Sequence, residues 1–354
     1  MMYDIAIIGL GPAGAALARL LAGKGSVAAV DRKGPSGGFE KPCGGLLAPD
    51  AQKALARLGL TLPKSLLAEP QIFSVRTIDL AAGLTRWYQR FYLNLDRAKF
   101  DRWMIEQIPS SVDLFLEARC RRVERIDGGF RVYYRQGGAE KRLECRTLIG
   151  ADGANSIVRR TFFPKKKIRS YMAVQQWFQD QNPNPFYSCV FDNKATDCYS
   201  WSICKDGHFI FGGAYPPKDC RRRFEDQKKA LEGRGFRFGP PVKTEACQVL
   251  RPKSWRQFCV GGEGVFLLGE AAGFISPSSL EGVSWALNSA MALAEALDSP
   301  EPHRAYSLFT LGMRLRLTAK LLKCPAMYQP VLRRLVLRSG VQALDLLDGG
   351  EEGE

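Results

Sequence analysis

The sequence has few of the residues that hold metals, and it has no long apolar run. Its 354 residues include two histidines, His208 and His303, and ten cysteines that are scattered without a Cys-x-x-Cys pair. Because a zinc site needs clustered ligands, we expect no metal. Glycine or charge interrupts every apolar run before it reaches the roughly 20 residues that cross a bilayer. The composition therefore argues against a metalloenzyme and against a membrane-spanning protein.

A basic leader is also lacking at the N-terminus. Residues 3–11, "YDIAIIGLG", read as a strand that enters a glycine turn rather than as a secretion signal. In a reducing compartment we expect most of the thiols to be reduced, buried and inert. We therefore expect a cytoplasmic protein, with peripheral contact to a membrane surface as a further option.

Acidic residues are scarce, and one segment has none. The chain carries 51 Lys and Arg against 36 Asp and Glu, a net charge of +15. From His303 to Leu344 eight Lys or Arg alternate with leucines, and no acid occurs. This segment is either a solvated helical surface or a face that attracts anionic lipid head groups or an acidic electron-donor protein. Nucleic acid is not expected, because no recognisable binding module accompanies the charge.

The strongest motif present is a glycine turn near the N-terminus. "GLGPAG" fits Gly-x-Gly-x-x-Gly, between a predicted strand and a predicted helix, and an acid follows the next strand. Its first glycine permits the tight turn, its second lets the backbone approach a pyrophosphate, and its third lets helix and strand pack closely. A dinucleotide is therefore expected at this turn. The predicted cofactor-binding residues are Gly9, Gly11, Pro12, Ala13, Gly14, Asp31 and Arg32.

Two further segments distinguish FAD from NAD. "TLIGADGANSIVRR" places Asp152 and Gly153 after a strand, and "VFLLGEAAGFISPSSLEGVSWAL" places Glu270 and Gly273 after another. With these three fingerprints the chain resembles the FAD-dependent oxidoreductases of the glutathione-reductase-like superfamily. The resemblance is to the group of p-hydroxybenzoate hydroxylase, flavin-dependent halogenases and geranylgeranyl reductases, and it covers approximately residues 1–300. It implies FAD as the cofactor.

Within that group, the geranylgeranyl reductase branch is the most similar. "KPCGGLLAPDAQKAL" is similar to its cysteine-glycine segment beside the flavin, and "YSW" is similar to its Tyr-x-Trp motif on the substrate sheet. "LDRAKFDRWMIEQ" resembles its helix whose first arginine contacts FAD, and "EGVSWALNSA" resembles its helix whose leading backbone lies against the flavin ring. The resemblance implies catalytic roles for Cys43, Tyr199 and Trp201, and cofactor contacts for Cys43, Gly44, Gly45, Arg97, Gly282 and Val283.

Several positions depart from the family pattern. Glu270 stands where the family usually has Asp. The Tyr-x-Trp segment lacks the preceding proline of the family, and Cys204 stands close to where the following one belongs. "YSWSIC" is about as similar to the halogenase motif Trp-x-Trp-x-Ile-Pro. The substrate therefore stays open at this point.

The same segments predict an α/β architecture with a discontinuous FAD-binding domain of the Rossmann type. Residues 1–50, 90–165 and 255–300 would form that domain. Residues 51–89 and 166–254, rich in aromatics and alternation, would form an inserted, mostly antiparallel substrate-binding sheet. Residues 301–354 would form a basic helical segment. Residues 96–108 predict a helix capped by Asp96 that buries Phe100, Trp103, Met104 and Ile108.

The favoured function is a flavin-dependent reductase of carbon-carbon double bonds in an isoprenoid or other apolar substrate. The first alternative is a monooxygenase or halogenase, in which reduced flavin meets oxygen. The second is a non-catalytic flavin-binding interaction protein. Because a second Gly-x-Gly-x-x-Gly is lacking, we expect electrons from transiently bound NAD(P)H, or from ferredoxin or a flavodoxin.

Overall fold

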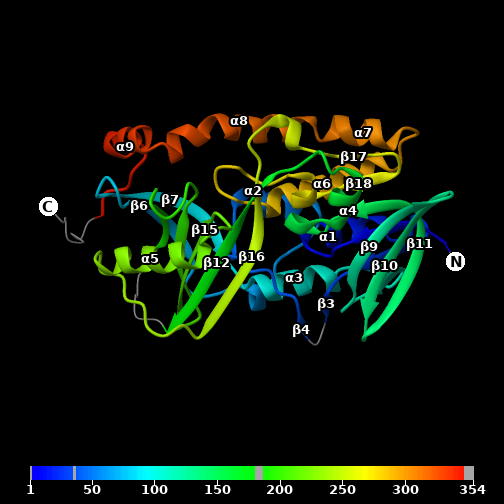
Figure 1. Ribbon diagram of the computed structural model, residues 1–354, viewed down its shortest axis with the longest axis horizontal. Helices are drawn as coiled ribbons and strands as arrows, with labels where there is room; N and C mark the ends of the chain where they lie inside the picture. Colours follow the sequence, from blue (N-terminus) through cyan, green and yellow to red (C-terminus); the bar gives the residue numbers. More distant parts are fainter. Residues whose placement is uncertain (1, 35–36, 180–185, 347–354) are drawn as a thin grey trace.

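Two eight-stranded sheets lie side by side in the computed structural model, which describes residues 2–34, 37–179 and 186–346 (Figure 1). The first sheet lies at the N-terminal end of the long axis, and the second lies at the other end. Helices cover both sheets and bridge them. The predicted α/β architecture is confirmed.

The first sheet has a parallel centre. β1 pairs in parallel with β2 and β11, and β8 and β18 extend it in the same direction. Antiparallel strands complete its edges. Its strands are β1 (Met2–Ile8), β2 (Val27–Val30), β8 (Val112–Phe115), β9 (Arg119–Ile126), β10 (Gly129–Gln136), β11 (Ala139–Gly150), β17 (Gly261–Gly262) and β18 (Val265–Leu267). β2 and the C-terminal ends of β1 and β11 are buried, which fits the near-continuous apolar runs of a parallel sheet.

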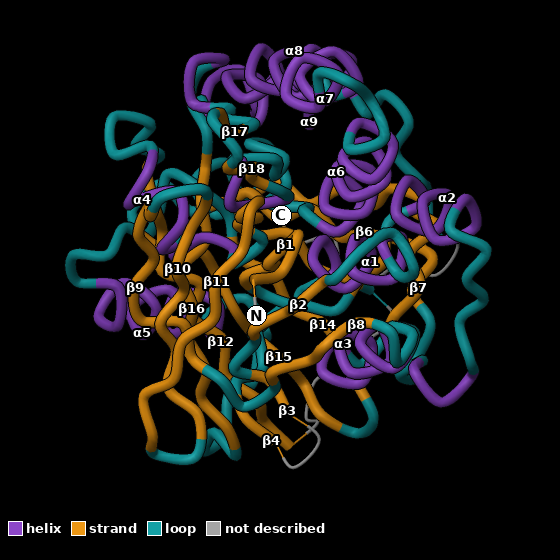
Figure 2. The backbone as a smooth tube through the Cα atoms, turned by 90° about the vertical axis from the view of Figure 1, so that its right-hand side faces the viewer, coloured by secondary structure: helices purple, strands orange, loops and turns teal. Residues whose placement is uncertain are grey.

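Helices from distant parts of the sequence pack on this sheet. α1 packs against α6 and α3, and α2 packs against α6, so that α1, α3 and α6 lie together beside the parallel strands (Figure 2). The helices beside this sheet, which we call the first domain together with it, are α1 (Pro12–Leu21), α2 (Pro49–Arg57), α3 (Arg97–Glu106), α4 (Ile157–Phe162) and α6 (Val283–Ala296). Short 3₁₀ turns follow several of the strands and helices: η1 (Lys64–Leu66), η2 (Gly153–Asn155), η3 (Trp255–Gln257) and η4 (Gly269–Ala272).

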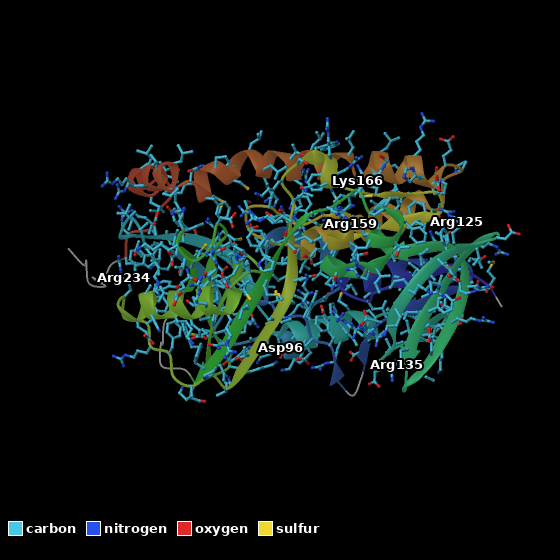
Figure 3. All side chains as sticks on the ribbon, viewed as in Figure 1. Asp96, Arg125, Arg135, Arg159, Lys166 and Arg234 are labelled. Carbon is cyan, nitrogen blue, oxygen red and sulfur yellow. The ribbon has the colours of Figure 1, made fainter. Side chains whose placement is uncertain are left out.

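α3 confirms the helix predicted from the sequence. The Asp96 carboxylate accepts hydrogen bonds from the main-chain N–H groups of Ala98 (2.8 Å) and Lys99 (3.0 Å), so it caps the helix as expected. Asp96 lies where the chain enters this helix (Figure 3). The four apolar side chains assigned to the buried side are buried: Phe100, Trp103, Met104 and Ile108.

The second sheet is mostly antiparallel. Its order is β16-β12-β15-β14-β13-β6-β7-β5, and the β13–β6 pair alone runs parallel among its described strands. The strands are β5 (Leu46–Leu47), β6 (Ile72–Asp79), β7 (Leu84–Asn94), β12 (Arg169–Gln179), β13 (Tyr187–Phe191), β14 (Ser200–Lys205), β15 (His208–Tyr215) and β16 (Lys243–Arg251). α5 (Cys220–Glu232) covers one side with Phe224 and Leu231. The other side faces the first domain. A short hairpin of β3 (Lys33–Gly34) and β4 (Gly37–Gly38) stands apart from both sheets.

Three C-terminal helices run along one long edge of the molecule and span both sheets (Figure 1). They are α7 (Pro302–Phe309), α8 (Leu311–Tyr328) and α9 (Pro330–Ser339). A buried ion pair anchors the last of them, because Arg333 Nε lies 2.7 Å from Asp79 Oδ2 at the end of β6. Within the described residues, no helix has the length and apolar character that a bilayer crossing requires.

The Arg333–Asp79 pair yields a stability prediction. Replacing Arg333 by Met leaves a carboxylate that is 1% exposed without its cation, so we expect the free energy of unfolding to fall by about 3–5 kcal/mol. Urea unfolding followed by circular dichroism measures this. The matched control is Arg304→Met, which breaks an exposed pair with Glu301 and should cost less than about 1 kcal/mol. Equal losses in the two variants would contradict the anchoring role of the pair.

Candidate functional site

The three motif glycines in the turn between β1 and α1 are explained in two different ways. Gly9 has φ +99°, and a Cβ there would lie 2.6 Å from the Ala151 carbonyl oxygen. A Cβ on Gly14 would overlap with the carbonyl oxygen of Gly9. Gly11, in contrast, has no described atom within 4 Å of a built Cβ, and its backbone is ordinary. Packing therefore explains Gly9 and Gly14, whereas Gly11 borders open space at the N-terminus of α1.

That N-terminus suits an anion. α1 has no side-chain cap, and Pro12 and Ala13 begin it without an acidic residue in the first turn. Free N–H groups and the positive end of the helix dipole therefore face the space beside Gly11. This is the arrangement that binds the pyrophosphate of a dinucleotide.

Asp31 lies at the end of β2, and it shapes the turn. Its two carboxylate oxygens accept hydrogen bonds from the main-chain N–H of Leu10 (2.5 Å) and of Lys33 (2.6 Å). A ribose bound here would share Asp31 carboxylate oxygens that already accept hydrogen bonds from main-chain N–H groups. Arg32 is exposed and stacks on Phe39, with its guanidinium carbon 3.3 Å from the ring centre.

Asp152 presents a buried acceptor that the described protein leaves unused. Its Oδ2 accepts a hydrogen bond from the Ile157 N–H at 2.6 Å, whereas its Oδ1 is buried and has no partner in the described part of the chain. Burial raises the pKa of this carboxyl. Asp152 lies beside the glycine turn, since its Cα would be 2.8 Å from a Cβ on Gly9, and Gly153 follows with φ +73°. A donor from a bound dinucleotide would satisfy the free oxygen.

In the third fingerprint, unlike Asp152, Glu270 has protein partners for both of its carboxylate oxygens. Glu270 Oε2 lies 2.6 Å from Lys41 Nζ, and its Oε1 accepts a hydrogen bond from the Leu250 N–H at 2.8 Å. Glu270 therefore links η4 to the loop before Cys43 and to the second sheet. Gly273 ends η4 with φ +83°.

Arg159 holds the same turn from the other side. Its guanidinium is buried and donates to the carbonyl oxygens of Ala271 (2.8 Å), Gln257 and Lys166. In Figure 3 Arg159 lies among the ribbons, whereas Arg125, Arg135 and Arg234 lie toward the periphery. Protein contacts therefore hold the η4 turn from both sides.

At the start of α6, packing does not require glycine. Gly282 has φ −130°, and a Cβ there would find its nearest described neighbour, Ile275, at 3.7 Å. Val283 is the first residue of the helix. Glu281 was not predicted as a site residue. It accepts hydrogen bonds from the Ser284 N–H and hydroxyl, both at 2.7 Å. Burial raises the pKa of Glu281.

The cysteine-glycine segment lies between the two sheets. The Cys247 thiol of β16 is 3.8 Å from the Pro42 carbonyl oxygen, and Gly44 lies against the Trp201 ring, 3.6 Å from a built Cβ. Cys43 is half-buried, and its Sγ accepts a hydrogen bond from the Gly45 N–H at 3.4 Å.

Arg97 adds a cation to this segment. Its Nε donates to Asp101 at 2.8 Å. Burial disfavours its charge, but the Asp101 carboxylate and the Cys43 sulfur together raise the pKa of Arg97 above its ordinary value.

Lys205 was not predicted as a site residue, although it lies beside this segment. It ends β14, is 4% exposed, and donates a hydrogen bond to the Leu95 carbonyl oxygen at 2.5 Å. Burial lowers the pKa of Lys205 to about 8, although Cys43 and Asp96 favour its charge. A Cβ on Gly45, whose φ is +67°, would overlap with Lys205 Nζ and Leu95 O. Gly45 is therefore required by the lysine and the turn.

The Tyr-x-Trp motif lies on the same side of β14. Alternation along the strand sends Ser200 and Cys204 toward α5, and sends Trp201, Ile203 and Lys205 toward the first domain. We call this side of the second sheet the inner face; it comprises Tyr187, Cys189, Tyr199, Trp201, Ile203 and Lys205.

The polar atoms of two aromatic side chains on the inner face differ in their hydrogen bonding. The Tyr199 hydroxyl donates to the Ser279 carbonyl oxygen at 2.6 Å, and burial raises its pKa well above the ordinary value. Both features make Tyr199 a poor proton donor. The Trp201 Nε1 is buried without a partner in the described part of the chain.

Two groups of the predicted residues thus come together. Gly9, Gly11, Gly14 and Asp152 surround the N-terminus of α1. Cys43, Gly44 and Arg97 meet Trp201 and Lys205 at the inner face. Lys205 leaves one trace in the sequence, a lysine that ends the otherwise uncharged strand "SWSICK".

A relative of known sequence identifies the family. Protein CbrA of Escherichia coli O9:H4 (strain HS) is 54% identical over 343 residues, covering 96% of the chain and 94% of the relative. The chain belongs to the CbrA family. No family model matches it. The name CbrA states no reaction.

Solved structures show which fold the CbrA family has. A geranylgeranyl bacteriochlorophyll reductase-like protein from Thermoplasma acidophilum superposes with a TM-score of 0.70 at 17% identity, covering 97% of this chain and 88% of its own. PqsL of Pseudomonas aeruginosa, a probable FAD-dependent monooxygenase, superposes with a TM-score of 0.70 at 18% identity, covering 96% and 99%. These likenesses confirm the Rossmann-like fold expected for this CbrA family member.

Lys205 yields a pH-dependent prediction. The unfolded lysine keeps its ordinary pKa of 10.5, so between about pH 8 and that value the unfolded state binds more protons than the folded state. This group alone therefore makes the free energy of unfolding rise with pH. Lys205→Met removes the rise, so the stability of the wild type relative to the variant should increase by on the order of 3 kcal/mol from pH 7 to pH 10.

Urea unfolding at the two pH values measures the difference. Lys229→Met, which removes an exposed lysine of α5, is the control and should show a difference independent of pH. A pH-independent difference for Lys205→Met as well would mean that burial does not perturb this lysine.

Proposed function

We propose that the chain is an FAD-dependent oxidoreductase that reduces carbon-carbon double bonds of an isoprenoid or another apolar substrate. The observation that supports it most is the inner face, where aromatic and aliphatic side chains lie opposite the cysteine-glycine segment. Tyr199, Trp201 and Ile203 are buried here and Tyr187 is partly buried, so the side chains that a substrate would meet beside this segment form an apolar surface. Such a surface favours a hydrocarbon substrate over a charged metabolite.

The residues present fit FAD. The open space beside Gly11 and the uncapped N-terminus of α1 would receive the pyrophosphate, and the unpartnered Asp152 oxygen would accept a hydrogen bond from a hydroxyl group of the cofactor. Gly282 and Val283 at the start of α6 would lie against the ring. When bound and reduced, FAD would supply hydride to a substrate carbon.

The chain would supply orientation and a proton. An isolated alkene accepts hydride poorly, so a proton must reach the second carbon before or during the transfer. Cys43 is the donor that we favour, because it lies at the inner face, whereas the Tyr199 hydroxyl is held by a carbonyl oxygen. Arg97 and Lys205 place two cations beside Cys43, and they would stabilise the charge that remains after it donates. Trp201 and Tyr199 would exclude water from the reacting carbons.

The electron donor would be transiently bound NAD(P)H or an acidic carrier such as ferredoxin or a flavodoxin. The net charge of +15 would attract an acidic protein. A monooxygenase or halogenase is the second candidate, because PqsL shares the fold over almost the whole of both chains.

A substitution at Gly11 tests cofactor binding without disturbing the fold. A side chain there meets no described protein atom, so Gly11→Val should fold with an unfolding temperature close to that of the wild type. The same side chain would block the close approach of a pyrophosphate, so FAD affinity should fall more than about tenfold. Isothermal titration of the flavin-free proteins measures the affinity. Gly312→Val, at a helical glycine with equal open space, should bind FAD like the wild type, and the proposal fails if Gly11→Val does so too.

Reduction of a prenyl chain tests the reaction directly. The holoprotein, reduced anaerobically with dithionite, should add two hydrogen atoms per double bond to geranylgeranyl lipids, which mass spectrometry detects. Cys43→Ala should stay yellow while turnover falls about tenfold or more. The control is Cys220→Ala at the start of α5, which should keep full turnover.

The failing outcomes point to different conclusions. No mass gain on any prenyl substrate would rule out the reductase. A long-lived spectral species and an oxygenated or halogenated product, formed when the reduced protein meets oxygen, would establish the second candidate. A bound flavin that no donor reduces would indicate a non-catalytic flavin-binding protein.

A further inference from the structure

The C-terminal helices expose an unusual number of apolar side chains. Twelve of the fifteen large apolar side chains that are exposed in the described residues lie between Leu308 and Leu346. Leu322 is 79% exposed and Val331 is 71% exposed. Single exposed leucines are ordinary, but a concentration of this kind on consecutive helices marks a binding surface.

The helical spacing gathers these side chains on outward stripes. On α8, Leu311, Leu315 and Leu322 share one side, while Leu317 faces inward and is buried. On α9, Val331 and Leu335 are one turn apart and exposed, while Leu337 is buried.

The inward sides of these helices already anchor them, so the fold does not explain the outward leucines and valines. We call the outward surface the outer helical face. It comprises Leu311, Leu315, Leu322, Val331, Leu335 and Val336 with the cations Arg316, Lys323, Arg334 and Arg338.

The charge of the outer helical face has one sign. Between His303 and Leu344 there is no Asp or Glu, and the four cations that flank the apolar stripes are exposed. Arg333, in contrast, turns inward to Asp79. A second copy of this chain would bring like charges together if it docked through the same face, which disfavours a symmetric dimer there. An anionic lipid surface offers both negative charge and an apolar interior.

The outer helical face lies close to the candidate site. Near the end of α8, the Tyr328 hydroxyl donates to the Ser278 carbonyl oxygen at 2.6 Å, and the Tyr328 ring meets Phe191 edge-on at 5.8 Å. The adjacent Ser279 carbonyl oxygen accepts the hydrogen bond of Tyr199. One helix thus has its outward side free and its inward side against the border of the inner face (Figure 1).

We propose that the outer helical face docks the protein onto the surface of an anionic lipid bilayer, with the apolar side chains entering the head-group region and the cations binding lipid phosphates. This docking needs no flavin chemistry, so it stands or falls independently of the proposed reaction. It would bring the border of the inner face to the place where apolar chains reside.

Vesicle co-sedimentation of the full chain tests the docking. Wild type should bind mixed phosphatidylcholine–phosphatidylglycerol vesicles and bind pure phosphatidylcholine vesicles at least about tenfold more weakly. Leu315→Gln with Leu322→Gln removes apolar contact without changing the charge, and Arg316→Glu with Lys323→Glu reverses charge. Each double variant should lose about tenfold or more in binding to the mixed vesicles.

A matched control uses the opposite side of the molecule. Arg221→Glu with Lys229→Glu on α5 changes the net charge by the same amount as the α8 charge variant, and it should bind like the wild type. Circular dichroism confirms that each variant is folded.

Three outcomes would overturn the proposal. The first is that the wild type does not bind the mixed vesicles at low salt. The second is that the α8 charge variant loses binding while the leucine variant keeps it, which indicates an electrostatic site for an acidic protein. The third is that sedimentation shows a wild-type dimer which the leucine variant converts to a monomer, which indicates a second copy on this face.

Discussion

The relative position of the two sheets depends on buried side chains that bind main-chain groups across the seam between them. Tyr199 reaches from the second sheet to the Ser279 carbonyl oxygen, and Glu270 reaches back from the first domain to the Leu250 N–H. Lys205 binds the Leu95 carbonyl oxygen where the chain leaves β7 of the second sheet. Each of these groups would be costly to bury without a partner. The seam therefore holds one geometry, and the cysteine-glycine segment lies inside it.

This constraint changes how the glycines of that segment are understood. The family resemblance assigns Gly44 and Gly45 to the approach of a flat ring. In the structure, Gly45 has φ +67° and leaves room for Lys205 and the Leu95 carbonyl oxygen, whereas Gly44 lies at ordinary contact distance from Trp201. Protein packing alone thus requires glycine at position 45, whether or not this residue also contacts the cofactor. Gly11 is the opposite case, since nothing in the described protein explains it.

Local features were predictable from the sequence, and distant contacts were not. The glycine turn, the Asp96 cap and the buried side of α3 each depend on residues within a few positions of one another, where turn geometry and helical spacing apply directly. The partners Lys205 and Leu95 are 110 residues apart, and Arg333 and Asp79 are 254 apart. No periodicity links such pairs, because sheet order and register decide which residues meet. The basic C-terminal segment was visible as a pattern, but only the structure separates its inward Arg333 from its outward cations.

The distance between Asp79 and Arg333 along the chain also affects how the protein is made. Ribosomes produce β6 long before α9, so the nascent second sheet contains a carboxylate whose cation has yet to be synthesised. Until Arg333 has been synthesised, burial of the unpaired Asp79 carboxylate at that end of β6 costs more free energy than leaving it hydrated. Docking of α9 onto the second sheet is consequently a late event, and a chain halted before α9 would leave the Asp79 carboxylate without its cation and the sheet less protected from chaperones and proteases.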